Sequence, residues 1–455
     1  MTSTADTVDT SPGDGLCLDA EGHCSLRAAI QETNALSGAD AIVLGAGEFV
    51  LTRAGAGEDA SATGDLDVND DLALVGAGAD ATIVDAGALD RVLDLHGGAP
   101  RTVGLTRLSL RNGWIGDITL GSGAGLRVDA GVDVTLSHVD VRDNRIGEAH
   151  VAVGIDNRGC LRADHVRIVG NIDPAAVGSR VARAGGIETQ GTGSCLLLED
   201  SEISGNHGAL AGAIHVTAGA SMTARRTLFA DNSARFAGAL ELASGAGVLL
   251  EAVTISGNAG DPGAILNDDA TQLVIVDSTI TGNHASGAIA NVGGIHDAHS
   301  ASGRTELTNS IVYGNGPGWR ADDCLNARSG GGGNVIGDAA HCHYQAGDGD
   351  QLDVDPGLGP LADNGGFTRT HLPGPNAIDR GAATCGATDQ RGMQRPRDGD
   401  DDGQSACDAG AVEVGDADVL FIDGFDGAAT SSSPRARATR SAVQPRAADR
   451  RTQGT

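Results

Sequence analysis

The sequence has no lysine, few aromatic residues and no long apolar run, and each absence excludes a class of protein. All 31 fixed positive charges are therefore arginines, against 61 acidic residues, and the formal net charge is −30. Such an acidic chain repels nucleic acid and anionic lipid and attracts divalent cations. We therefore expect no nucleic-acid partner, and a bare acidic polysaccharide would be repelled as well.

The scarcity of aromatic side chains indicates how the interior is filled. Phe, Trp and Tyr make up 2% of the chain, whereas 70 of its 455 residues are glycine. This composition suits a thin structure filled by small aliphatic side chains, and an elongated repeat protein can use such a length as one body. No stretch is long and apolar enough to cross a bilayer, so we expect no transmembrane segment.

Eight cysteines form an even set, which favours disulfides and an oxidising, extracellular compartment. The first residues, MTSTADTVDTSPGDG, are polar and do not form a signal peptide. We therefore expect the chain to be a mature form or to have a misplaced start.

The region from Gly104 to Asn315 repeats itself. Similar segments each end in asparagine, 25 to 27 residues apart except for two intervals of 32 and 35 residues. A period near 26 with longer exceptions is typical of solenoid coils, some of which carry an inserted loop. The asparagines are Asn144, Asn171, Asn206, Asn232, Asn258, Asn283 and Asn315.

Apolar residues keep fixed positions relative to these asparagines. The positions three, eight and ten residues before each Asn are apolar, apart from Thr305. Mostly polar residues separate the last two positions, as expected for a strand with one buried face. A further strand precedes them, in segments such as GAIHV (212–216) and GALEL (238–242). Three short strands per coil predict an all-β fold, the right-handed, single-stranded parallel β-helix of the pectin-lyase-like type.

The asparagine column has a structural explanation. Asn tolerates the left-handed backbone that a tight corner requires, and stacked Asn amides can hydrogen-bond from coil to coil. The alternative is a column of ligands for a bound molecule.

The register of the coils also predicts disulfides. Cys160 and Cys195 each lie eleven residues before an Asn, so they occupy the same position in adjacent coils, roughly 4.8 Å apart. This separation is compatible with a disulfide. By proximity in the sequence, the other pairs are Cys17–Cys24, Cys324–Cys342 and Cys385–Cys407.

Residues 25–36 are expected to form a short amphipathic helix. Leu26, Ala29 and Ile30 recur at helical spacing, and Ser25 stands at the N-cap position. The end of a β-helix exposes strand edges and needs a cap. We expect this helix, held by the Cys17–Cys24 disulfide, to cover the first coil.

At this point the chain resembles a family. CSLRAAIQETNAL, at residues 24–36, looks like the CSLREA region at the front of many secreted bacterial β-helix proteins, with Ala28 in place of the family's Glu. LADNGGFTRTHLPGPNAIDRG, DQRGMQRPRDGDDDG and CDAGAVE resemble the C-terminal choice-of-anchor region of such proteins. The paired segments AGAI…FADN and AGAL…ISGN are similar to repeats of polymorphic outer-membrane proteins, whose relatives are surface adhesins. The resemblance implies a secreted or surface-exposed bacterial protein without a defined chemistry.

We divide the chain into four parts. Residues 1–38 form the N-terminal cap, and residues 39–320 form the parallel β-helix. Residues 321–426 form a disulfide-containing C-terminal cap or anchor-associated region. Residues 427–455 are rich in Arg, Ala, Ser, Thr and Pro without an apolar pattern, so we expect a disordered tail.

The outward columns of the early coils offer candidate catalytic side chains. Six residues before the Asn stand His138, His165, Asp200 and Arg226, and four before it stand Asp140, Arg167 and Glu202. Stacked roughly 4.8 Å apart, they form either a charge ladder of modest stabilising effect or a ligand-binding or catalytic stripe.

Other groups are candidates for metal binding, with a solvated acidic turn or face as the alternative. In DGDDDG, Asp398, Asp400 and Asp402 match the first half of a calcium-loop pattern, and Ala409 at the twelfth position excludes a complete EF-hand. Two carboxylates on one face of a strand, Asp65 and Asp67, are a second candidate cation site. Two histidine pairs in loop sequence are further candidates for metal binding, namely His296 with His299 and His341 with His343.

We therefore expect an exported bacterial surface or matrix protein, non-catalytic, that presents its faces for glycan binding or adhesion. The alternative is a β-helix polysaccharide lyase or glycoside hydrolase that uses the stripe from His138 to Arg226. Turnover separates the two, since only an enzyme yields new chain ends.

Overall fold

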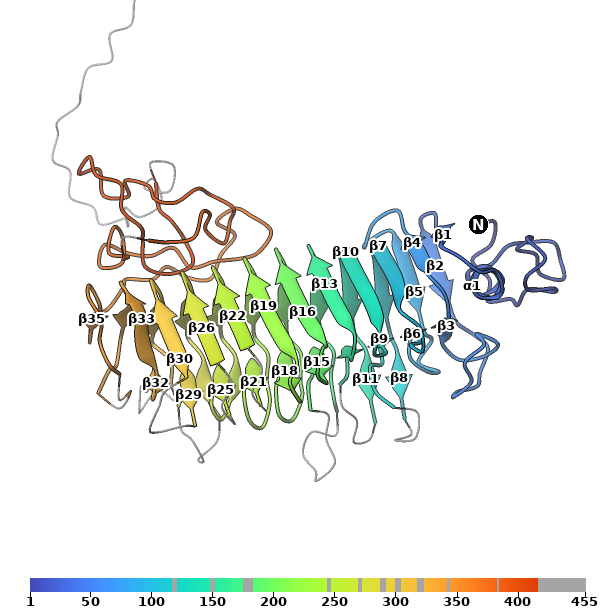
Figure 1. Ribbon diagram of the computed structural model, residues 1–455, viewed down its shortest axis with the longest axis horizontal. Coiled ribbons are helices and arrows are strands. Elements are labelled where there is room, and N and C mark those ends of the chain that lie inside the picture. The colour runs from blue at the N-terminus through green and yellow to red at the C-terminus, as the bar shows by residue number, and fades with distance from the viewer. Residues whose placement is uncertain are drawn as a thin grey trace, which may run out of the picture.

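In the computed structural model, parallel strands stack along one axis into an elongated rod (Figure 1). The structure describes residues 1–116, 121–147, 152–174, 183–243, 247–268, 272–286, 292–298, 304–316, 323–340, 342, 344–382 and 384–415. Each coil from residue 155 to residue 313 contributes one strand to sheet B and two strands to sheet A. The fold is the right-handed parallel β-helix that the repeat predicts. In the part of the chain that the structure describes, no helix could span a membrane.

Among the described residues, sheets A and B contain 21 and 10 strands, and two short pairs form at the corner that follows the asparagine column. Sheet A consists of β1 (Asp40–Val43), β2 (Gly47–Val50), β4 (Leu72–Val75), β5 (Thr82–Asp85), β7 (Arg101–Arg111), β10 (Val132–Arg142), β13 (Cys160–Asp164), β14 (Arg167–Val169), β16 (Cys195–Glu199), β17 (Glu202–Ser204), β19 (Ser221–Arg225), β20 (Leu228–Ala230), β22 (Gly247–Glu251), β23 (Thr254–Ser256), β26 (Gln272–Val276), β27 (Thr279–Thr281), β30 (Thr305–Thr308), β31 (Ile311–Tyr313), β33 (Arg328–Gly332), β34 (Val335–Ile336) and β35 (Gln351–Leu352). Sheet B consists of β3 (Leu66–Val68), β6 (Leu93–Leu95), β9 (Leu126–Val128), β12 (Ile155–Asn157), β15 (Ile187–Gln190), β18 (Ile214–Thr217), β21 (Leu240–Leu242), β25 (Ile265–Asn267), β29 (Ile295–Asp297) and β32 (Cys324–Leu325). The short pairs are β8 (Trp114–Ile115) with β11 (Arg145–Ile146), and β24 (Ala259–Gly260) with β28 (His284–Ala285).

The predicted helix, α1 (Leu26–Ala35), lies at the N-terminal end of the rod (Figure 1). Ser25 is its N-cap and accepts a 3.1 Å hydrogen bond from the Ala28 amide. Leu26, Ala29 and Ile30 join the apolar interior of the β-helix. The helix therefore covers the apolar interior at this end, because its apolar face replaces the coil that is missing there.

Arg27 anchors the helix in a way that the sequence did not reveal. Its guanidinium is buried, lies 2.6 Å from Asp6, and donates to the carbonyls of Ser61, Gly64 and Asp65. A buried arginine needs both a countercharge and acceptors, and here it has both.

The asparagine column forms a buried ladder. Each Asn side chain donates through Nδ2 to Oδ1 of the Asn in the next coil, over 2.8 to 3.0 Å, from Asn144 to Asn315. The same Oδ1 atoms accept from the backbone amides of the preceding rungs. The ladder ends at Asp323, whose Oδ1 accepts from Asn315. At this last position the side chain only has to accept hydrogen bonds from Asn315, because no further asparagine follows to which it would donate.

One detail of the predicted corner is wrong. The left-handed residue is not the Asn but the residue before it, such as Asp143, Gly170 or Asp231, with φ of 58°, 66° and 56°. Gly and Asp tolerate this conformation. The Asn that follows is thereby turned inward, where its amide stacks.

All four predicted disulfides are present: Cys17–Cys24, Cys160–Cys195, Cys324–Cys342 and Cys385–Cys407. Cys160 and Cys195 are register partners in β13 and β16, with Cα atoms 4.5 Å apart.

The C-terminal region differs from its predicted place. Parallel strands continue beyond residue 320 as far as β35, so the coils extend into the predicted cap. Residues 355–415 then turn back along the side of sheet A (Figure 1, orange to red). Arg395 of this segment forms an ion pair with Asp277 of the β-helix, because its buried guanidinium lies 3.6 Å from Asp277 and 3.7 Å from Glu413. This segment therefore covers a side of the rod rather than its end. The predicted tail lies outside the described residues.

Candidate functional site

A column of mostly charged or titratable side chains runs along the outward face of sheet B. In β3, Leu66 and Val68 point into the core, so Asp67 between them points outward. The register carries this outward position through successive strands, each roughly 4.8 Å from the next. The column consists of Asp67, Asp94, Arg127, Asp156, Glu188, His215, Glu241, Leu266, His296 and Leu325.

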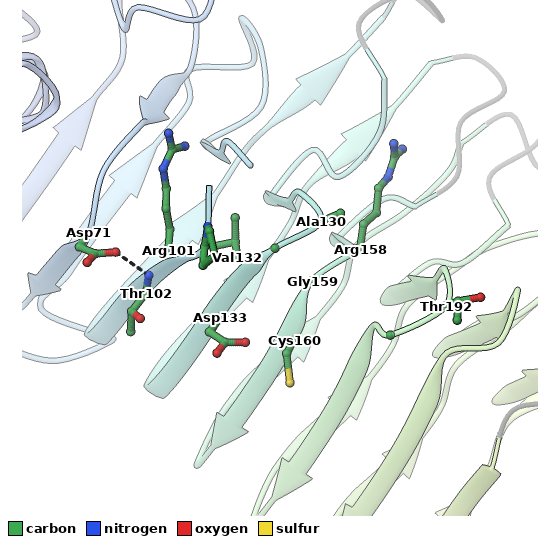
Figure 2. A pocket seen from close by; sticks show the side chains of 13 residues that line it. Asp71, Arg101, Thr102, Ala130, Val132, Asp133, Arg158, Gly159, Cys160 and Thr192 are labelled. Atoms are coloured by element: carbon green, nitrogen blue, oxygen red, sulfur yellow. Dashed lines mark hydrogen bonds between the residues drawn. The ribbon is translucent and has the colours of Figure 1, made fainter. Parts of the chain in front are cut away.

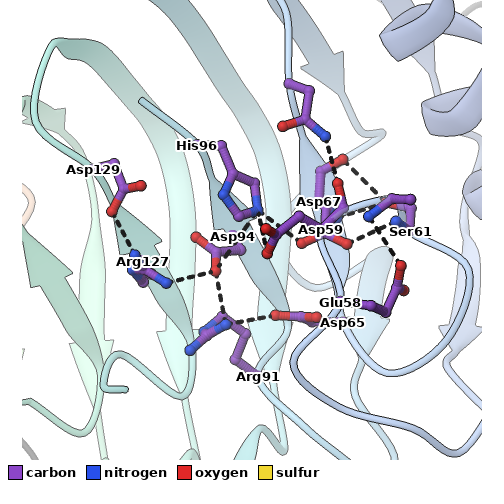
Figure 3. Close-up of polar contacts among 12 residues, drawn as sticks. Glu58, Asp59, Ser61, Asp65, Asp67, Arg91, Asp94, His96, Arg127 and Asp129 are labelled. Carbon is purple, nitrogen blue, oxygen red and sulfur yellow. Dashed lines mark hydrogen bonds and ion pairs between the residues drawn. The ribbon is translucent and has the colours of Figure 1, made fainter. Parts of the chain in front are cut away.

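At its N-terminal end the column is a dense ion-pair network (Figure 3). Arg91 donates to both Asp65 and Asp94, over 2.8 and 2.7 Å, and Arg127 reaches Asp94 at 3.2 Å. His96 lies 2.9 Å from Asp67, and this hydrogen bond raises the pKa of the histidine. Burial raises the pKa of Asp94.

The same network tests the cation site that the sequence suggested at Asp65 and Asp67. Carboxylate oxygens of Asp65, Asp67 and Asp94 lie within 4.8 Å of one another, close enough to share an ion. However, the Arg91 guanidinium already bridges Asp65 and Asp94. The shared arginine therefore explains why Asp65 and Asp94 lie close together. Asp67 accepts a hydrogen bond from the Ser61 amide and lies 2.9 Å from His96.

The middle of the column holds an imidazole between two glutamates. Glu188, His215 and Glu241 are register partners in β15, β18 and β21. Glu188 Oε2 lies 2.7 Å from His215 Nδ1. Burial raises the pKa of Glu188 and of Glu241. Burial opposes the charged imidazolium of His215, but the bond to Glu188 and both glutamate charges raise its pKa overall.

Several polar atoms on the column are buried without a hydrogen-bond partner among the described residues. A buried polar atom in this state signals a water, an ion or a ligand that would satisfy it. Five of the eleven such atoms among the described residues lie on this column, and the others lie beside it or in the C-terminal segment. The five on the column are Asp94 Oδ1, Arg127 Nε, Glu188 Oε1, Glu241 Oε2 and His296 Nδ1.

The stripe predicted from the sequence lies elsewhere, at a corner of sheet A. His138, His165, Asp200 and Arg226 all adopt left-handed backbone, with φ between 44° and 54°. The rings of His138 and His165 stack with centroids 4.8 Å apart, and Arg226 forms a double hydrogen bond with Asp200. The choice between the charge ladder and the ligand-binding or catalytic stripe stays a prediction.

The second column of the predicted stripe is partly covered. Asp140, Arg167 and Glu202 are register partners on adjacent strands. The guanidinium of Arg167 lies 5.5 Å from the Phe367 ring, and Arg369 lies 3.5 Å from Glu202. Both partners belong to the C-terminal segment along sheet A, so this column contacts protein over part of its length.

The predicted calcium loop is only partly assembled. Asp398 and Asp400 approach Asp379, with carboxylate oxygens within 4.8 Å of one another. Asp402 is not part of this group, and its Oδ1 accepts from the Gln404 amide. Calcium at this loop remains a prediction.

Of the predicted histidine pairs, one residue lies on the column. His296 belongs to β29 of sheet B, and burial lowers its pKa. His299, His341 and His343 lie outside the described residues.

A cavity of about 310 Å³ adjoins the column (Figure 2). Its walls come from the segments that enter β7, β10 and β13, and include Arg101, Asp133 and Arg158. Arg158 also lies 2.8 Å from Asp156 of the column, which links the cavity wall to the charged face.

One family model agrees with the fold. A family model described as the right-handed β-helix region matches residues 151–345. Among solved structures, the chain is similar to "Crystal structure of pectate lyase Pel9A", at 14% sequence identity and a TM-score of 0.47, over 90% of this chain and 95% of that chain. No curated protein matches the sequence. The strand register and the family match therefore define the class, a right-handed parallel β-helix.

Sequence reasoning missed Glu188, His215 and Glu241 as a group, although a signal was present. GAIHV and GALEL each carry one charged or titratable residue between apolar residues, at His215 and Glu241. The expected strand there has two buried apolar positions and an outward one between them. Reading that central position from coil to coil would have found the column.

Proposed function

We propose that this protein is an exported β-helix protein that binds an extended polysaccharide without acidic groups along the outward face of sheet B. One observation carries the proposal: five buried polar atoms that make no hydrogen bond among the described residues lie in one column that runs along the rod. Sugar hydroxyl groups both donate and accept hydrogen bonds, so a glycan chain supplies partners for carboxylate, guanidinium and imidazole alike.

The charge of the column selects the ligand. Asp67, Asp94, Asp156, Glu188 and Glu241 face Arg127 and two histidines, and the whole chain has a formal charge of −30. Bringing a polyuronate to this face would place like charges together, which is unfavourable. Neutral or amine-bearing chains escape this repulsion.

Export is supported by the disulfides, since such bonds persist in oxidising compartments. The resemblance to secreted CSLREA and choice-of-anchor proteins points to the same compartment. A surface or matrix protein that displays this face to glycans agrees with both.

The test is binding to soluble xylan, a β-glucan, chitosan oligosaccharides and polygalacturonate, measured by calorimetry. We expect at least one non-acidic glycan to bind and polygalacturonate to bind weakly or not at all. Arg127→Ala and Glu241→Gln, which alter the column, should each weaken binding three-fold or more. Glu199→Gln, on sheet A and half-exposed, is the matched control and should bind as the unaltered protein does. Binding of polygalacturonate alone would refute the proposed ligand class.

A further inference from the structure

We propose that the cavity of about 310 Å³ beside the column binds a short uncharged side chain of the glycan, so that the protein prefers branched glycans to linear ones. This inference rests on the proposed function, because the glycan backbone that carries the side chain lies along sheet B. The site lies at the corner where the chain leaves sheet B and enters sheet A, and we call it the corner cavity. Its polar wall residues are Asp71, Arg101, Thr102, Asp133, Arg158 and Thr192.

One edge of the corner cavity is a row of side chains on sheet A. Thr102, Asp133 and Cys160 are register partners at the start of β7, β10 and β13. Asp71, directly before β4, accepts a 2.7 Å hydrogen bond from the Thr102 amide. Successive strands are roughly 4.8 Å apart, so this sheet A row runs parallel to the axis of the rod. Thr102 and Asp133 are exposed, and the Asp133 carboxylate accepts no hydrogen bond from the described residues, so both can contact a ligand.

The opposite edge of the corner cavity is formed by two arginines. Figure 2 shows the side chains of Arg101 and Arg158 on one side of the turn at Ala130, and those of the sheet A row on the other. Arg101 donates to the carbonyl of His96, and Arg158 donates through Nε and Nη2 to Asp156, over 3.1 and 2.8 Å. A guanidinium group has five N–H donors, so both arginines keep donors for a ligand.

These two edges suit an uncharged sugar. A sugar hydroxyl group both donates and accepts, so hydroxyls on one edge of a ring can donate to Asp133 while those on the other edge accept from the arginines. Pro100 adds apolar surface to the wall, and ligand sites combine apolar surface with a few polar groups. The carboxylates of Asp71 and Asp133 balance the charges of Arg101 and Arg158, so the cavity favours neither an anion nor a cation.

The position of the corner cavity indicates a side chain of the glycan rather than its backbone. Arg158 belongs to the cavity wall and lies 2.8 Å from Asp156 of the sheet B column, so the two sites lie side by side. Both follow the axis of the rod, because both are rows of register partners. A glycan chain along the column therefore reaches the cavity only through a group that projects sideways from it. The volume of about 310 Å³ is at the small end of the roughly 300–1,000 Å³ of ligand sites, which favours a short side chain.

The experiment measures by calorimetry how matched linear and branched neutral oligosaccharides bind to the full chain. The matched pairs are mannan with galactomannan oligosaccharides, and xylan with arabinoxylan oligosaccharides. Since two linked contacts bind more tightly than one, we expect the branched member of at least one pair to bind about ten-fold more tightly than the linear member, or better.

Variants of the two edges locate this preference in the corner cavity. Asp133→Ala and Arg101→Met each remove polar groups from one edge and should lower the preference to about two-fold or less. Asp133 is exposed, so its replacement should leave the fold intact, and thermal unfolding checks both variants. Glu199→Gln, on sheet A but outside the cavity, is the matched control and should keep the full preference.

The outcomes separate this inference from the proposed function. Equal binding of the linear and branched members of both pairs overturns the inference and leaves the proposed function intact. A preference for the branched member that survives in both Asp133→Ala and Arg101→Met also overturns it, because the side chain is then held elsewhere. Absence of binding to every non-acidic glycan, linear or branched, overturns the proposed function itself.

Discussion

Replacing one rung of the asparagine ladder tests how the coils are held in register. Asn232 lies in the middle of the ladder and is fully buried. Its Oδ1 accepts from both the backbone amide and Nδ2 of Asn206, each over 3.0 Å. Its own Nδ2 donates to Ile203 O and to Asn258 Oδ1, over 2.9 and 3.0 Å. Asn232→Ala removes all four bonds.

The cost follows from the groups that are left behind. Two donors of Asn206 lose their acceptor in a buried place, and each such loss costs about 1–3 kcal/mol. We therefore expect Asn232→Ala to lower the free energy of unfolding by about 2–6 kcal/mol. This is a large share of the roughly 5–15 kcal/mol that stabilises a folded domain.

The assay is equilibrium unfolding in guanidinium chloride, with a lower midpoint at an unchanged slope as the expected result. Asp231→Asn is the matched control, because that neighbouring side chain is 65% exposed and should change stability by less than about 0.5 kcal/mol. If Asn232→Ala costs no more than the control, the ladder does not stabilise the rod, and the reasoning from buried donors fails.

Three further predictions concern other buried or acidic groups. Burial raises the pKa of Asp323 to about 6 from 3.8, so the native state binds more protons between these values. Stability should therefore fall by roughly 3 kcal/mol as the pH rises from about 4 to 6, and Asp323→Asn should flatten this slope in urea unfolding at each pH. Arg395→Met leaves the Asp277 carboxylate buried without its cation, which should cost about 3–5 kcal/mol of stability. A protease should then cut residues 355–415 faster than in the unaltered protein, and an unchanged rate of cleavage would contradict the role of Arg395. Calcium should raise the Tm of the protein but not of Asp400→Asn; equal Tm values with calcium and with chelator would identify the loop as a solvated turn.

The sequence by itself determined the coil and its interior. Val141, Ile168 and Ile203 recur at one distance from their asparagines, so periodicity alone predicted which side chains face inward. The same register placed Cys160 opposite Cys195. These features are local: a strand and the corner that follows it have a fixed length, so aligned positions in the sequence become stacked positions in space.

The charged face of sheet B was decided only by the tertiary structure. Glu188, His215 and Glu241 precede their asparagines by 18, 17 and 17 residues, whereas Asp156 precedes Asn171 by 15. The distance varies because segments of different length join sheet B to sheet A. An alignment on the asparagines therefore does not bring these side chains into one column, and the backbone pairing of sheet B does.

The position of the C-terminal segment was also decided by the tertiary structure. Phe367 and Arg369 cover part of the predicted stripe, and Arg395 meets Asp277, across more than a hundred residues of sequence. Sequence patterns report on neighbours along the chain and on repeating coils. A non-repeating segment that packs on the side of the rod is placed by complementary charge and burial, which become visible only once both surfaces have formed.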